Sequence, residues 1–142
     1  MGLNRMGLIL DSSVVIAAER QHETVAQLLR RIVLTAGDQR VALSSVGLTE
    51  LVHAIYRASN PVQRQNHERF IADLLADMEV VSYAKATALL AGKIDGEQRA
   101  QGVTIPFVDL LIGVTALEHG YTVATVNLRH FRLIPGLEII PF

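Results

Sequence analysis

The feature that most constrains this fold is a short apolar run at residues 8–10 (Leu-Ile-Leu), which ends in Asp11 and two serines. A second apolar run follows at once, and this pattern predicts a buried strand that turns directly into a helix. Asp11 then lies at the carboxyl end of the strand, the edge of an open parallel sheet where ligands bind. No other formal charge lies between Arg5 and Glu19. Burial would therefore leave this carboxylate desolvated unless a cation neutralises it.

The rest of the chain alternates short strands with helices, which predicts an α/β fold with a parallel sheet. Half of the 142 residues are hydrophobic, which favours a sheet covered on both faces and further apolar surface buried between subunits. We therefore expect residues 1–142 to form one three-layer α/β/α domain around a central, mainly parallel sheet of four to five strands. After residues 8–10, strands are expected at 41–43, 79–82, 121–125 and 137–140, and helices at 22–36, 46–57, from 60 onward, 83–99 and 107–119.

Composition excludes several classes of protein. The chain has no cysteine, so disulfides and thiolate metal sites are excluded, and any metal must be held by oxygen or imidazole. A net charge of −1, from 13 basic and 14 acidic residues, gives no global basic field for non-specific duplex binding. No apolar window approaches the roughly 18 residues of a membrane span, and no secretory signal precedes the first strand. These features predict a cytoplasmic protein, with Met6 a second candidate for the start residue beside Met1.

Two further carboxylates share the isolation of Asp11. Glu50 is the sole formal charge in the window 41–56, and Asp109 is the sole formal charge in the window 100–117. Each lies just past an expected strand or in the first turns of an expected helix. Since the carboxyl ends of parallel strands meet at one edge of a sheet, the three acids are expected to converge there.

A cluster of three carboxylates has a defined chemistry. Their mutual repulsion would raise their pKa values unless a cation lies between them. An all-oxygen ligand set favours Mg²⁺ or Mn²⁺, and such ions serve phosphodiester cleavage best. Nucleophilic serine chemistry is disfavoured, because Ser12, Ser13 and Ser44 have no general base at a suitable position in the sequence.

Each acid also has an ordinary explanation that must be weighed. Asp109 is an acid in the first turn of a helix, where its negative charge interacts favourably with the helix dipole. Asp11 is placed to cap the helix that follows it. Glu50 is harder to explain in this way, because a glutamate in mid-helix caps nothing. Three such coincidences at one sheet edge are much less frequent than one.

The remaining polar candidates carry weaker signals. Asn127 follows the strand 121–125 and is by default a turn residue. Arg57 and Arg129 are candidates for contacts with a phosphate backbone, although surface arginines commonly serve solvation alone.

Three stretches together resemble the PIN-domain ribonucleases, in particular the VapC-like toxins of type II toxin–antitoxin pairs. They are LILDSSVVIAAE, SSVGLTELVHAIY and the segment that runs from GVTIPFVDLLIGV to the C-terminus. Their order and spacing fit the family across essentially the whole chain.

The resemblance implies a Mg²⁺- or Mn²⁺-dependent endoribonuclease, with the attacking water positioned by Asp109 and Glu50. Such toxins are typically homodimers that cleave RNA and are inhibited by a cognate antitoxin protein. The resemblance makes Asp11, Glu50 and Asp109 the catalytic, metal-binding acids and puts Asn127 near the usual fourth position. The implied orienting hydroxyls are those of Ser13 and Thr125.

One position departs from the family pattern. The family often carries an acid shortly after the asparagine, and His130 stands there in this chain. The resemblance therefore implies one well-held ion, with His130 expected to pack in the protein or to face solvent. The rival interpretation is a non-catalytic PIN-like module that binds RNA or a protein partner without turnover.

Overall fold

The fold was analysed in a computed structural model that describes residues 7–142, so the two candidate start residues, Met1 and Met6, lie outside the described residues. All strand pairs in the described chain are parallel, and the sheet has five strands in the order β3-β2-β1-β4-β5. The strands are β1 (Gly7–Leu10), β2 (Val41–Ser44), β3 (Glu79–Val81), β4 (Tyr121–Thr125) and β5 (Ile139–Pro141). The predicted parallel sheet is confirmed.

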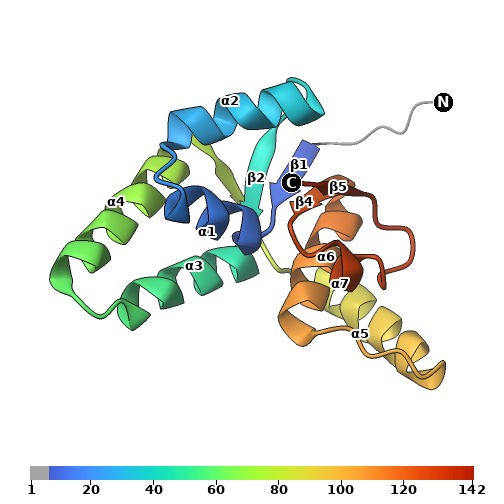
Figure 1. The fold of residues 1–142 in the computed structure, drawn as a ribbon. Coiled ribbons are helices and arrows are strands. Elements are labelled where there is room, and N and C mark those ends of the chain that lie inside the picture. Colours follow the sequence, from blue (N-terminus) through green and yellow to red (C-terminus); the bar gives the residue numbers. More distant parts are fainter. Residues whose placement is uncertain (1–6) are drawn as a thin grey trace.

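Helices cover both faces of this sheet, which confirms the three-layer arrangement (Figure 1). One face is covered by α1 (Ser12–Arg20), α2 (Val25–Ala36), α3 (Ser45–Arg57) and α4 (Pro61–Asp77). The other is covered by α5 (Lys85–Ala100), α6 (Phe107–His119) and the short α7 (Leu128–Phe131). None of the helices in the described part of the chain is long and apolar enough to cross a membrane.

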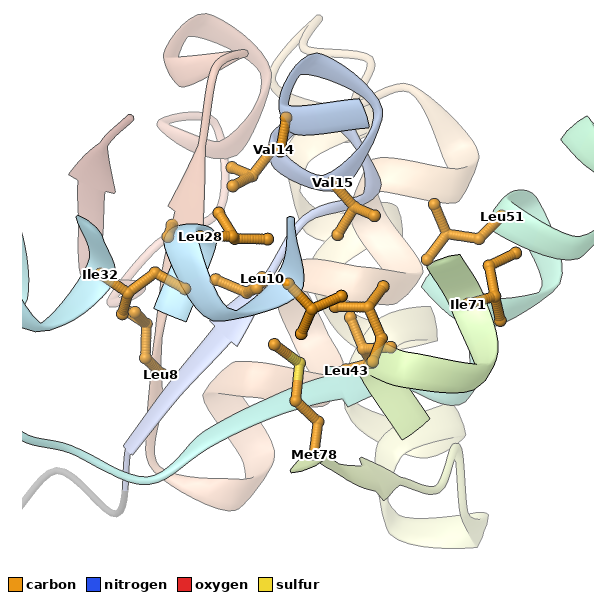
Figure 2. Close-up of a cluster of buried hydrophobic side chains, with 14 of the residues drawn as sticks. Leu8, Leu10, Val14, Val15, Leu28, Ile32, Leu43, Leu51, Ile71 and Met78 are labelled. Carbon is orange, nitrogen blue, oxygen red and sulfur yellow. The ribbon is translucent and has the colours of Figure 1, made fainter. Parts of the chain in front are cut away.

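The central strand β1 supplies both cores, because successive side chains of a strand point to opposite faces. Leu8 and Leu10 pack into the cluster beneath α1 and α2, together with Leu28 (Figure 2). Ile9 packs into the opposite cluster, together with Ile112 of α6. All three β1 side chains are fully buried, as expected for a strand covered on both faces.

The strand order places β1 at the point where the chain changes direction across the sheet. From β1 the chain moves to β2 and β3 on one side, and it later returns to β4 and β5 on the other. Leu10 is level with Ala124, and the Asp11 backbone N–H donates to the Ala124 carbonyl at 2.9 Å. The residues that follow β1 and β4 therefore meet where the chain changes direction across the sheet. In an open α/β sheet this position is the usual ligand site.

The helix expected at residues 22–36 begins later, at Val25. Thr24 and Gln27 form a capping box, in which each side chain accepts a hydrogen bond from the other's backbone N–H. These bonds satisfy amide groups that the first helical turn leaves unpaired. The boundary is thus set three residues after the predicted one.

The helix expected at residues 83–99 also begins later, at Lys85. Thr87 accepts a hydrogen bond from the Ala84 backbone N–H at 3.2 Å, which satisfies one of the unpaired backbone donors at the helix start.

Gly113 lies where α6 meets the segment that contains α7. A Cβ built at Gly113 would collide with Ile134 and lie 3.3 Å from Phe131, which belong to α7 and the segment after it. Glycine therefore lets α6 pack against the α7 segment, which carries residues of the site described next.

Candidate active site

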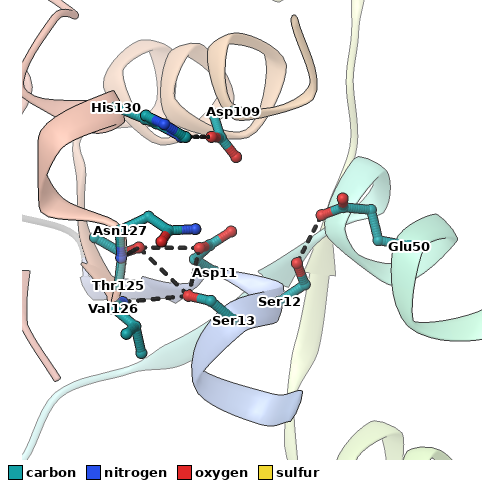
Figure 3. Close-up of polar contacts among 9 residues, drawn as sticks. All are labelled: Asp11, Ser12, Ser13, Glu50, Asp109, Thr125, Val126, Asn127 and His130. Atoms are coloured by element: carbon teal, nitrogen blue, oxygen red, sulfur yellow. Dashed lines mark hydrogen bonds and ion pairs between the residues drawn. The ribbon is translucent and has the colours of Figure 1, made fainter. Parts of the chain in front are cut away.

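Asp11 occupies the position before α1, yet its side chain makes no capping hydrogen bond. Its Oδ2 accepts hydrogen bonds from Ser13 Oγ at 2.6 Å and from Thr125 Oγ1 at 2.9 Å (Figure 3). Its Oδ1 is buried and has no hydrogen-bond partner among the described residues. Helix capping therefore does not account for this carboxylate, and one of its oxygens is left available.

Glu50 reaches the same edge of the sheet from α3. Ser44 accepts a hydrogen bond from the Gly47 backbone N–H at 2.9 Å and starts this helix at the end of β2. Glu50 Oε1 then accepts a hydrogen bond from Ser12 Oγ at 2.6 Å (Figure 3). Sequence reasoning considered Ser12 as a nucleophile and missed this contact. The contact could have been predicted, because Ser12 directly follows Asp11 and so lies at the sheet edge where Glu50 was expected.

Asp109 lies in the first turn of α6, as predicted. Its Oδ2 is 2.6 Å from Nδ1 of His130, which belongs to α7 (Figure 3). An ionised carboxylate can only accept a hydrogen bond, so Nδ1 must carry the proton and donate it. The His130 side chain is 34% exposed, and its ring engages one of the three acids, a contact that the sequence did not predict.

The environment of Asp11 opposes its negative charge. Burial raises the pKa of this carboxyl, and the charge of Asp109 raises it further. The hydrogen bonds from Ser13 and Thr125 act in the opposite direction without cancelling the effect of burial. The side chain is 1% exposed, so water offers it little compensation.

Glu50 is affected in the same way. Burial raises the pKa of its carboxyl, and the charges of Asp11 and Asp109 add to the rise, while the Ser12 hydrogen bond and the more distant charge of Arg57 oppose it. The charge of Asp109 thus acts on both Asp11 and Glu50, and the charge of Asp11 acts on Glu50. Together they create a negative region that a cation would relieve.

Asn127 lies beside this region, and the two arginines lie on the helices α3 and α7. The Asn127 backbone N–H donates to Thr125 Oγ1 at 2.8 Å, and its side chain points toward Asp11 in Figure 3. Arg57 and Arg129 are both exposed, on α3 and α7 respectively. The structure therefore gathers the predicted acids, hydroxyls and amide at one edge, with the two arginines on neighbouring helices.

Comparison with known proteins assigns this arrangement to a family. The model of the PIN domain matches residues 8–137. The chain belongs to the PIN-domain family. Among its relatives, ribonuclease VapC1 of Rickettsia felis is 30% identical over 135 residues, which cover 95% of this chain and 96% of that protein. The resemblance to the VapC branch of PIN domains is thereby confirmed.

Solved PIN-domain structures confirm the fold. The crystal structure of VapBC2 from Rickettsia felis, bound to a promoter DNA fragment, superposes with a TM-score of 0.81 at 23% identity and covers 95% of this chain and 98% of that one. VapBC-5 from Mycobacterium tuberculosis, a member of the VapBC family of toxin–antitoxin systems, gives a TM-score of 0.72 at 20% identity over 96% of this chain and 98% of that one.

The donor set of this PIN domain fits a hard divalent cation. Each of the three acids has one oxygen held by a protein donor, and the other oxygen of Asp11 is buried without a partner. Oxygen ligands of this kind suit Mg²⁺ and Mn²⁺. No three His, Asp or Glu side chains in residues 7–142 are grouped closely enough in this structure to hold an ion together.

In the absence of divalent ions, Asp11 is expected to make stability fall as pH rises. Since burial raises its folded-state pKa, the folded protein holds more protons than the unfolded chain above pH about 4, and the free energy of unfolding decreases until the raised pKa is passed. Asp11→Asn removes this contribution and should raise the melting temperature of the metal-free protein at pH 7. Thermal unfolding of both proteins in EDTA from pH 4 to pH 8 measures the difference. A difference that does not grow with pH would contradict the expectation.

Proposed function

We propose that this PIN domain is a metal-dependent endoribonuclease toxin that cleaves RNA phosphodiester bonds and is inhibited by a cognate antitoxin. Mg²⁺ is the proposed cofactor, with Mn²⁺ as the alternative. The observation that supports this most strongly is the buried, unpartnered oxygen of Asp11 beside Asp109, whose charge raises the pKa of both Asp11 and Glu50. The name of the VapC1 relative supplies the proposed substrate class, RNA.

In this proposal, Asp11, Glu50 and Asp109 hold the ion. When bound, a divalent ion activates water for attack on phosphorus and stabilises charge on the departing oxygen. Hydrogen bonds from Ser13 and Thr125 fix the orientation of Asp11. A metal-binding side chain that is already fixed in the binding orientation loses less conformational freedom when the ion binds, so it binds the ion more tightly.

Glu50 has a second role in this proposal. Ser12 holds one of its oxygens, so the other can orient the attacking water together with Asp109. The exposed Arg57 and Arg129 would bind phosphates that flank the cleaved bond.

The proposed protein partners are an antitoxin and a second copy of the chain, in the cytoplasm. Solved VapBC structures with this fold support the first. Exposed apolar side chains support a further protein interface, since such surface is unfavourable in water. The most exposed of these are Leu34, Leu89, Tyr56, Val62 and Phe107.

RNA cleavage by the purified chain, free of antitoxin, tests the proposal. We expect cleavage in Mg²⁺, its loss in excess EDTA, and its recovery when Mg²⁺ is added back beyond the chelator. Ribonuclease contamination is controlled by a parallel purification of an empty expression strain. Cleavage that continues unchanged in EDTA would contradict a metal mechanism.

One observation favours the rival, a PIN domain that binds RNA without turnover. The described acids do not yet form a group of three that could hold a metal ion. This rival predicts RNA binding that responds neither to Mg²⁺ nor to Asp11→Asn. RNA affinity measured by filter binding under those conditions, beside the cleavage assay, separates the two functions.

A further inference from the structure

The contact between His130 and Asp109 joins two segments that are distant in sequence. Asp109 is in the first turn of α6, and His130 lies in α7, directly before the fully buried Phe131. Phe131 packs close to Gly113 of α6, so the backbone beside His130 is fixed against the helix that carries Asp109. The 2.6 Å hydrogen bond therefore joins two parts that the core already holds together.

The donor to Asp109 differs in kind from the donors to the other acids. Asp11 and Glu50 are held by serine and threonine hydroxyls, which can rotate and turn a lone pair toward a cation. The protonated Nδ1 of His130 cannot do so, because it offers a hydrogen and no lone pair. Asp109 Oδ2 is thus occupied, while the other Asp109 oxygen has no hydrogen bond to a described residue and points toward Asp11 in Figure 3.

This hydrogen bond bears on how tightly an ion would be held. It fixes the rotation of the Asp109 carboxylate, and a ligand with a fixed orientation loses less freedom when it binds. The other oxygen of Asp109 would therefore hold a divalent ion more tightly with His130 in place.

We propose that His130 is a positioning residue: its hydrogen bond to Oδ2 directs the other oxygen of Asp109 toward Asp11, so that the centre binds a divalent ion more tightly than it would without His130. The inference depends on the metal centre of the proposed function and requires no particular substrate. In this proposal His130 is not a metal ligand, because it acts on the ion only through Asp109.

Mn²⁺ binding to the full chain, followed by electron paramagnetic resonance of the free ion, tests this directly. The wild type is expected to bind one Mn²⁺. His130→Ala should bind it about 10- to 100-fold more weakly, the usual effect of removing a hydrogen-bond partner of a metal ligand. His130→Asn, whose amide N–H replaces the Nδ1 donor, should restore the affinity to within about threefold, because the orienting bond is remade.

The control is His119→Ala, on the same helix as Asp109 and with a similarly exposed side chain, 31% against 34% for His130. It should bind Mn²⁺ like the wild type. Circular dichroism and melting temperature of the metal-free variants establish that each is folded. The proposal is overturned if the wild type binds no ion, if His130→Ala binds as tightly as the wild type, or if His130→Asn is as weak as His130→Ala. No RNA is present, so a failure to cleave RNA leaves this result intact.

Discussion

Asp11→Asn is expected to reduce Mg²⁺-dependent RNA cleavage by at least about 100-fold, since loss of a charged metal ligand removes several kcal/mol of transition-state stabilisation. Asparagine has nearly the same shape, and its carbonyl oxygen can still accept the hydrogen bonds from Ser13 and Thr125. The variant should therefore stay folded while losing the negative charge. Initial cleavage rates of wild type and variant at saturating Mg²⁺ measure the effect.

The matched control is Asp38→Asn, which makes the same chemical change at an exposed position. Its cleavage rate should equal that of the wild type. If Asp11→Asn cleaves RNA as fast as Asp38→Asn does, Asp11 is not part of the catalytic centre.

Phe131→Ala is expected to lower the free energy of unfolding by about 3–5 kcal/mol, the usual cost of deleting a buried aromatic side chain. Phe131 is completely buried in the cluster between the sheet and α6. The collapse of the resulting cavity is restricted, because Gly113 contributes no side chain to fill it. Urea denaturation monitored by circular dichroism gives the difference in free energy.

Phe107→Ala provides the comparison with the same pair of residue types. Phe107 is 64% exposed at the start of α6, so its removal should change the free energy of unfolding by no more than about 0.5 kcal/mol. Equal losses at the two positions would show that Phe131 is not in the core.

The sequence was sufficient to predict the parallel sheet and the three acids at its edge. Leu8 to Leu10 form an apolar run too short for a helix and bounded by Asp11, so a buried strand was the simplest interpretation. Glu50 and Asp109 were found because a lone charge in an apolar window needs an explanation, and both lie at the edge where β1 ends (Figure 3).

The contacts that hold these acids could not be predicted in the same way. Ser12 meets Glu50 across 38 positions, and His130 meets Asp109 across 21. Such pairs depend on the exact rotation of α3, α6 and α7 against the sheet, which periodicity does not define. The start of α2 was predicted three residues too early for a related reason. The spacing of apolar residues carries no information about the local hydrogen bonds of Thr24.

The central claim is that Asp11, Glu50 and Asp109 converge to bind a divalent ion. Anomalous diffraction from crystals of the full chain grown with Mn²⁺ tests it most directly. The account predicts one anomalous peak, in contact with carboxylate oxygens of Asp11 and Asp109 and next to Glu50. A map at saturating Mn²⁺ with no peak between these side chains would contradict it.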